Sequence, residues 1–284
     1  MRAKYLCALS VLFMGPALSF TGNTPVSKQG GVQAAQITTV TSAVPGVLMQ
    51  KTSSGEINWT DGYVATSGEG KIIKGPNLRI CDSMARRAAL LDAQAKVLRM
   101  VQGIRLDGTM TVKESIARNQ RLFYGLKGLI ARVRAFDQHK NKGVYIVRIR
   151  VPLYGTRGIQ GIFHDEYVKS GSGRARQTRT RCVVIDARGT GLTPALFIKI
   201  KDQTGRDVYS TRDVAVSDLL NKGMAVYVTS TALQQDDVEV KALRAAGPQH
   251  SDIVVSFADA DRLKSVDGSL PACPVVVIAD PFTE

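Results

Sequence analysis

Four arginines alternate with apolar residues along two segments, 130–136 and 144–151, whose pattern is typical of β-strands. These arginines are Arg132, Arg134, Arg148 and Arg150. The loop between the segments, His139–Gly143, ends in a glycine that can adopt a positive φ, so the sequence predicts a β-hairpin. Strand alternation then places all four arginines on one face of the hairpin.

The chemistry of this face is anion binding. Guanidinium groups present paired N–H donors to phosphate and carboxylate oxygens. A turn centred on Asn141 sets Arg134 opposite Arg148 and Arg132 opposite Arg150, and like charges so placed cost up to ~1 kcal/mol per pair. We therefore predict that the face meets an anionic partner, either an acidic protein surface or phosphate-bearing material. The alternative is a solvated sheet face whose long side chains point apart into water.

Other residue combinations do not match the motifs of catalysis or cofactor binding. Gly68–Lys71 resembles part of a phosphate-binding loop, but Ala65 stands where the first glycine is required and Ile72 follows the lysine in place of Ser or Thr. The histidines lie far apart in the sequence, at His139, His164 and His250. We therefore expect no enzyme activity, no cofactor and no metal site. An enzyme whose site is assembled only in space is the least favoured alternative.

Two cysteines stand beside apolar strands. Cys182 opens one predicted strand, and Cys273 precedes another, over Val275–Ala279. If these strands are neighbours, we expect a disulfide that closes a loop of about 90 residues and stabilises the fold by ~3–4 kcal/mol. The alternative is that Cys81, Cys182 and Cys273 are all free thiols.

The N-terminus has the pattern of a secretory signal peptide over residues 1–19. Basic residues in Met1–Lys4 precede an apolar stretch over Tyr5–Met14, and small residues lead to a cleavage site near Ser19. Cys7 lies too early in this segment to be a lipidated cysteine. No apolar run reaches the ~18–20 residues that cross a bilayer. We expect a periplasmic or secreted protein that does not span a membrane.

Composition divides the rest of the 284-residue chain into a flexible tether over 20–55, a first domain over 56–155, a basic linker over 156–181 and a second domain over 182–284. The expected fold class is α+β. The first domain has the predicted order β-α-β-α-β-β in two layers, and the second is a mixed α/β domain. A chain with 44% hydrophobic and 22% charged residues has a globular composition.

The predicted two-layer arrangement of the first domain depends on one long helix. Asp82 or Ser83 is expected to cap it, and Gly103 to end it. Its expected inward stripe consists of Met84, Ala88, Leu91, Ala95 and Leu98. A strand over Arg105–Val112 and a second helix over Glu114–Leu129 are predicted to follow.

The second domain has short apolar runs separated by turn residues, which predict strands. Asp202–Arg206 has the composition of a hairpin turn. Short helices are expected over Asp213–Leu220 and Asp259–Val266.

Charge is distributed unevenly in a chain whose net charge is +14. Residues 20–156 carry 20 basic and 8 acidic side chains, whereas residues 182–284 carry 10 and 14. Export argues against nucleic acid, the usual partner of such a basic chain. Opposite charges on the two domains favour self-association that is steered electrostatically and weakened by salt. The alternative is that the asymmetry only aids solubility.

Two stretches of the sequence form recognisable patterns. The first consists of Gly68–Lys71, Ala85–Lys96, Gly103 and Val147–Leu153. The second consists of Val184–Ala195 and Gly205–Tyr209. Together they resemble the LPP-twenty-like lipoprotein domain and the exported flagellar assembly proteins of the FlgT and FlgP type.

The resemblance implies an exported, non-enzymatic component that helps to build rings around the flagellar basal body, and it carries no catalytic residues. The lipobox cysteine of the lipoprotein members is not found here. We therefore expect a periplasmic structural or assembly protein of the basal body, with protein partners in the cell envelope. The alternative is an envelope-binding module that docks on peptidoglycan or anionic lipid through its basic first domain.

Overall fold

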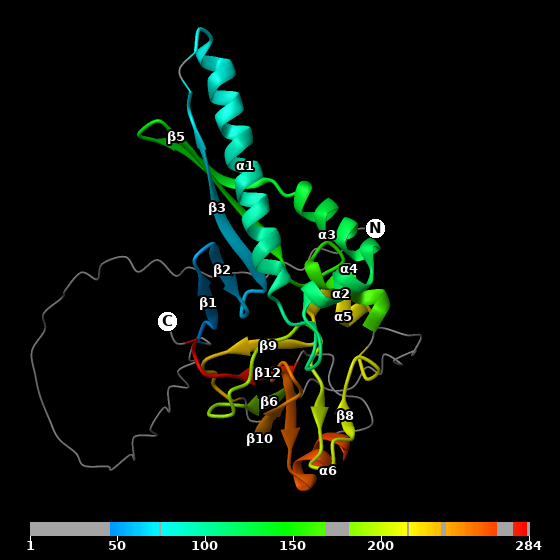
Figure 1. Cartoon of the computed structure of the whole chain (residues 1–284). Helices are drawn as coiled ribbons and strands as arrows, with labels where there is room; N and C mark the ends of the chain where they lie inside the picture. The colour runs from blue at the N-terminus through cyan, green and yellow to red at the C-terminus, as the bar shows by residue number, and fades with distance from the viewer. Residues whose placement is uncertain are drawn as a thin grey trace, which may run out of the picture. The chain divides into compact units, whose positions relative to one another are not determined.

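The fold is described from a computed structural model, shown in Figure 1, in which the described residues, all from 46 onward, belong to one compact unit. The described residues are 46–73, 75–167, 182–214, 216–233, 237–265 and 275–282. The predicted signal peptide, most of the tether, the basic end of the linker and Cys273 lie outside the described residues. Helices and two separate sheets confirm the predicted α+β class.

The first sheet has five antiparallel strands in the order β1-β2-β3-β5-β4. Their bounds are β1 Met49–Thr52, β2 Gly55–Asn58, β3 Tyr63–Lys71, β4 Ala135–Asn141 and β5 Val144–Pro152. β1 lies within the segment predicted as a tether, and Leu48 just before it is buried. The predicted tether is therefore wrong in its last ten residues, because residues 46–55 belong to the folded unit.

Helix α1, Leu78–Gln102, runs along one face of this sheet (Figure 1), but its predicted inward stripe is wrong. Met84 is 66% exposed and Leu91 is 56% exposed. The buried face consists of Ala85, Ala89, Ala93, Val97, Met100 and Val101. The predicted caps are also wrong, because the side chain of Asn77 accepts the hydrogen bonds that begin the helix; Gly103 ends it as expected.

Two glycines of β3 explain which face of α1 is buried. A Cβ atom on Gly68 would lie 2.8 Å from the Ala93 Cβ, and one on Gly70 would lie 2.8 Å from the Ala89 backbone nitrogen. Glycine in a strand permits such a close approach of another backbone. Only alanine-sized side chains fit between the two elements, so the methionine and leucine are turned outward.

The segment after α1 differs from the prediction. Residues 105–111 form a loop in place of the strand expected over Arg105–Val112, because the Asp107 carboxylate turns the chain by accepting hydrogen bonds from the Thr109 and Met110 backbone N–H groups. The single helix expected over Glu114–Leu129 is divided into α2, Val112–Arg118, and α3, Gln120–Ala131. Asn119 divides them, because it is extended and its side chain caps α3.

The hairpin of β4 and β5 is present, but its predicted register is wrong. Helix α3 continues through Ala131, so β4 begins later than expected. Lys142 and Gly143 form the turn with φ of 44° and 81°, the conformation that favours a two-residue hairpin loop. This turn pairs Asp137 with Arg148, so the expected opposition of Arg134 and Arg148 does not occur.

The second sheet has seven strands in the order β8-β7-β11-β10-β6-β12-β9. The bounds are β6 Val183–Asp186, β7 Ile200–Lys201, β8 Asp207–Tyr209, β9 Ala225–Val228, β10 Val238–Ala246, β11 Asp252–Val255 and β12 Val275–Ile278. The helices of this part are α5, Val216–Lys222, and α6, Phe257–Ser265. Each strand and helix predicted in this part overlaps an observed one, and the parallel pairs of β10, β6, β12 and β9 form one side of the sheet, with β9 at its edge.

The two sheets share one hydrophobic core, and backbone hydrogen bonds link the loop after α1 to the segment before β7. Leu196 N donates to Arg105 O at 3.1 Å, and Phe197 N donates to Leu106 O at 2.7 Å. Gly46 is bonded in the same way to the residues that follow β9. Buried side chains of both sheets belong to one cluster. The residues predicted as two domains therefore share a core in this structure.

Helix α4, Ile159–Tyr167, lies in the first part of the predicted linker. Its Ile159 and Phe163 side chains are fully buried. The buried Gln160 fixes the start of the helix, because its N–H donates to Leu153 O at 2.8 Å and its amide donates to Leu196 O at 3.1 Å. The linker prediction is therefore wrong for residues 159–167.

Candidate functional site

The structure separates the four predicted partner-binding arginines into two groups. Arg148 and Arg150 occupy alternate exposed positions of β5, on the face away from α1, as predicted. Arg132 is the C-cap of α3, and Arg134 lies between that helix and β4. Neither belongs to a strand, because the residues before Ala135 are occupied by the helix and its cap.

Arg150 is held by aromatic side chains. Its guanidinium carbon lies 4.0 Å from the ring centroid of Tyr63 and 5.1 Å from that of Phe136. Phe136 is available because the β4–β5 ladder is irregular between Ala135 and Asp137. Cation–π contacts of this kind orient a guanidinium group without neutralising its charge. Arg150 is therefore positioned but keeps its hydrogen-bond donors for another molecule.

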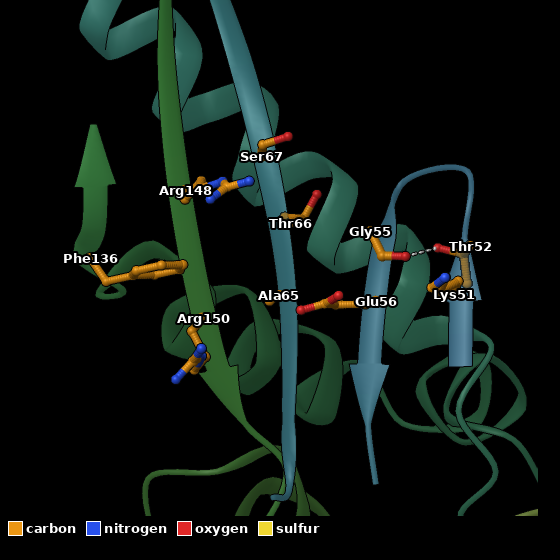
Figure 2. A pocket seen from close by; sticks show the side chains of 10 residues that line it. All are labelled: Lys51, Thr52, Gly55, Glu56, Ala65, Thr66, Ser67, Phe136, Arg148 and Arg150. Carbon is orange, nitrogen blue, oxygen red and sulfur yellow. Dashed lines mark hydrogen bonds between the residues drawn. The ribbon is translucent and has the colours of Figure 1, made fainter. Parts of the chain in front are cut away.

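Arg148 has a different environment. It lies opposite Ser67 of β3 and Asp137 of β4, and its Nη1 is 3.9 Å from an Asp137 carboxylate oxygen. Figure 2 shows it beside Arg150 at a shallow pocket of about 430 Å³ on the outer face of the sheet. Glu56 and Lys51 also line that pocket, so its charge is mixed.

A larger groove gathers arginines from three parts of the fold, and we call it the arginine groove. Its volume is about 790 Å³. Its basic lining residues are Arg132, Arg134, Arg150 and Arg157. Its other lining residues are Tyr124, Gly125, Gly128, Leu129, Val133, Pro152, Thr156 and Ile162. Three of the four predicted arginines therefore meet here, although the register that predicted their meeting was wrong.

Arg157 is the groove residue that the sequence analysis did not identify. It stands in the predicted basic linker, two residues before α4. The hydrogen bonds of Gln160 hold the start of α4 against Leu153 and Leu196 and so place Arg157 at the groove. An apolar position every three or four residues over 159–163 was the available signal that this part of the linker is helical.

The electrostatics of the arginine groove favour an anion. No carboxylate lines it, and none of its four arginines forms an ion pair with any residue of the described ranges. All four are exposed, so their charges are partly screened by water and salt. The walls also include Tyr124, which is 66% exposed, and the partly buried Leu129 and Ile162. The arrangement suits a ligand with oxyanions and some apolar surface.

Among the residues that the structure describes, no three His, Cys, Asp or Glu side chains converge as a metal site requires. Burial raises the pKa of the Tyr154 and Tyr209 phenols above their usual value, which keeps both protonated at neutral pH. No helix among the described residues combines the length and apolarity of a membrane span.

The structure describes two of the three cysteines that follow the predicted signal peptide. Cys182 is disulfide-bonded, and Cys81, in the first turns of α1, is a free thiol. Cys273 lies outside the described residues, so the predicted Cys182–Cys273 pairing stays a prediction.

A protein-family model matches part of the chain. The family model for the second domain of Treponema pallidum Tp0624 matches residues 182–281, which hold the whole seven-stranded sheet and less than half of the chain. This match covers the second of the two stretches whose resemblance is described above. A search of curated proteins found no match.

Proposed function

We propose that this protein is a non-enzymatic docking component of the cell envelope, whose arginine groove binds an anionic surface of its partner. The observation that carries the proposal is the groove itself, with four arginines and no carboxylate in its lining. A guanidinium group that forms no ion pair within the described residues keeps donors for charge-assisted hydrogen bonds to another molecule. The separation of the arginines over α3, β5 and the start of α4 fits a broad contact better than a small ligand.

We further propose that the partner is an acidic protein surface in the rings of the flagellar basal body. The support is the resemblance of the two sequence stretches to flagellar assembly proteins, together with the predicted signal peptide. The mixed polar and apolar lining of the groove fits a protein surface, because protein interfaces combine apolar contacts with Arg anchors.

The second candidate function is an envelope-binding module that docks on peptidoglycan or anionic lipid. The strongly basic composition of residues 20–156 favours it, because 20 basic and 8 acidic side chains attract any anionic surface. Binding of this kind would be spread over the basic surface, whereas binding by the groove would depend on its particular arginines.

The test is a groove variant in which three arginines are changed to glutamine. The changes are Arg132→Gln, Arg134→Gln and Arg157→Gln. Each exposed contact contributes about 0.5–1 kcal/mol, so the loss of three should weaken binding to a ring partner about 10- to 100-fold. We expect unchanged thermal stability, because none of the three forms an ion pair within the described ranges.

The matched control removes the same charge from exposed positions outside the groove. Its changes are Arg79→Gln, Arg86→Gln and Arg121→Gln, at exposed arginines that line none of the pockets described here. In cells, loss of motility with intact filament genes in the groove variant alone supports the basal-body role. Binding to purified cell-wall sacculi, or to vesicles containing phosphatidylglycerol, is measured for both variants. An equal loss of this binding in the two variants supports the second function, the envelope-binding module. Full motility and full binding in the groove variant would show that the groove is not a docking site.

A further inference from the structure

The outward face of α1 is apolar, although nothing in the described ranges covers its centre. Met84, Ala88 and Leu91 are exposed there, and Ile80, which is 56% exposed, extends the surface toward the N-terminus of the helix. At 100° per residue, this face is centred about 170° around the helix from the alanine face that packs on β3. The helix therefore has two apolar faces, and only one is used by its own sheet.

The outward face repeats with the spacing of a coiled coil. Its residues are Cys81, Met84, Ala88, Leu91, Ala95 and Leu98, at steps of three, four, three, four and three. The two end residues, Cys81 and Leu98, are half-buried, and Leu98 also packs against the protein's own core. We call this set the α1 seam. Such alternation is the a/d pattern along which two helices pack knobs into holes. A helix that only covers a sheet does not require this strict alternation on its solvent side.

The α1 seam is complementary to itself in one arrangement. Small residues occupy one series of positions, Cys81, Ala88 and Ala95, and large residues occupy the other, Met84, Leu91 and Leu98. In an antiparallel pair related by a two-fold axis between residues 89 and 90, position i meets position 179 − i of the other copy. Every small residue then meets a large one across the seam.

A parallel arrangement does not have this property. It would place Leu91 against Leu91 and Ala88 against Ala88. Contacts between two large residues would then alternate along the interface with contacts between two small ones. Alternation of large and small residues across facing positions gives even packing, so the antiparallel pair is favoured. The same patch serves both copies in a two-fold contact, as is usual for homodimers.

We propose that the α1 seam is a homodimer interface, in which α1 packs antiparallel against α1 of a second copy of this chain. Helix α1 carries five basic and two acidic side chains, so the two copies repel each other at low ionic strength. Salt screens this repulsion, so the seam contact should strengthen as salt is added. The head-to-tail contact expected from the charge asymmetry should weaken under the same conditions.

Sedimentation equilibrium of the mature chain tests the interface at several salt concentrations. We expect a dimer whose dissociation constant falls as salt is added. Leu91→Glu should raise that constant at least tenfold while the thermal stability of the monomer is kept, because Leu91 is 56% exposed. Ser83→Glu is the matched control, since it adds the same charge to an exposed position of α1 outside the seam. A wild-type monomer at all salt concentrations, or equal effects of the two variants, would overturn the proposal.

Disulfide trapping tests the orientation. Residue 98 of one copy should lie against the partner's Cys81, so Leu98→Cys should form a covalent dimer under mild oxidation. Residues 81 and 98 of one helix are about 25 Å apart, which excludes a link within the chain. Leu98→Cys combined with Cys81→Ser should give no dimer. A covalent wild-type dimer through Cys81 of both copies would show a parallel pair and refute the antiparallel arrangement.

Discussion

Substitution of Gly68 by alanine tests the close packing of α1 on β3. The added Cβ would lie 2.8 Å from the Ala93 Cβ and would overlap the Ala89 carbonyl oxygen. Carbon atoms in favourable contact are about 3.5–4.0 Å apart, so helix and strand must separate locally by about 1 Å. Neither backbone can rotate away as a flexible side chain would. Overpacking of this kind costs about 2–3 kcal/mol, so we expect a fall in the melting temperature of roughly 4–12 °C.

Gly128→Ala is the matched control for this substitution. Gly128 lies in α3, and a Cβ on it meets nothing within 4 Å. Alanine is favoured over glycine in a helix by about 0.8–1.0 kcal/mol, so this variant should be slightly more stable than the wild type. Urea unfolding of both variants measures the difference. If Gly68→Ala is as stable as the wild type, the argument that α1 is held by backbone proximity is wrong.

Two further predictions concern titration and the cysteines. The Asp202 carboxylate accepts hydrogen bonds from the Thr204 hydroxyl at 2.6 Å and from Arg206 N and Nε at 3.0 and 2.9 Å, and these hold its pKa at about 2. Because the folded pKa lies below the unfolded value, this contribution is present above pH ~4 and is lost as the pH falls toward 2. In the Asp202→Asn variant, the urea midpoint of unfolding should therefore change less between pH 5 and pH 2 than it does in the wild type. The same change of midpoint with pH in both proteins would contradict this. Thiol titration of the unfolded, unreduced mature chain should find one free thiol, Cys81, whereas three would refute the Cys182–Cys273 disulfide.

The second sheet was largely predictable because its strands are short apolar runs with clear boundaries. Val275–Ile278 is a continuous β-branched run, and such runs are typical of strands buried on both faces. The turn over Asp202–Arg206 carries the Asp and Gly signals of a hairpin. In these segments the local sequence and the final packing favour the same structure.

The first sheet was harder to predict because distant residues decide its details. Both faces of α1 are apolar, and the choice between them rests on Gly68 and Gly70 of another element. The hairpin register depends on Lys142, a residue that rarely adopts the positive φ found here. The arginine groove depends on the placement of α4, because that placement brings Arg157 to the same groove as Arg132 and Arg134, which lie more than twenty positions earlier in the sequence. None of these effects is visible in a local pattern.

The hydrogen bonds of Gly46 have a consequence for solubility. β9 is an edge strand of the seven-stranded sheet, and an uncovered edge offers its unpaired backbone groups to other chains. Gly46 N donates to Ser230 O at 2.8 Å, Thr229 N donates to Gly46 O at 3.0 Å, and Val47 bridges to Val228. The segment that leads into the first sheet thus shields this edge from sheet extension. In a fragment limited to residues 182–281, the outer edge of β9 would be uncovered. We expect such a fragment to aggregate through the unpaired backbone groups of this edge.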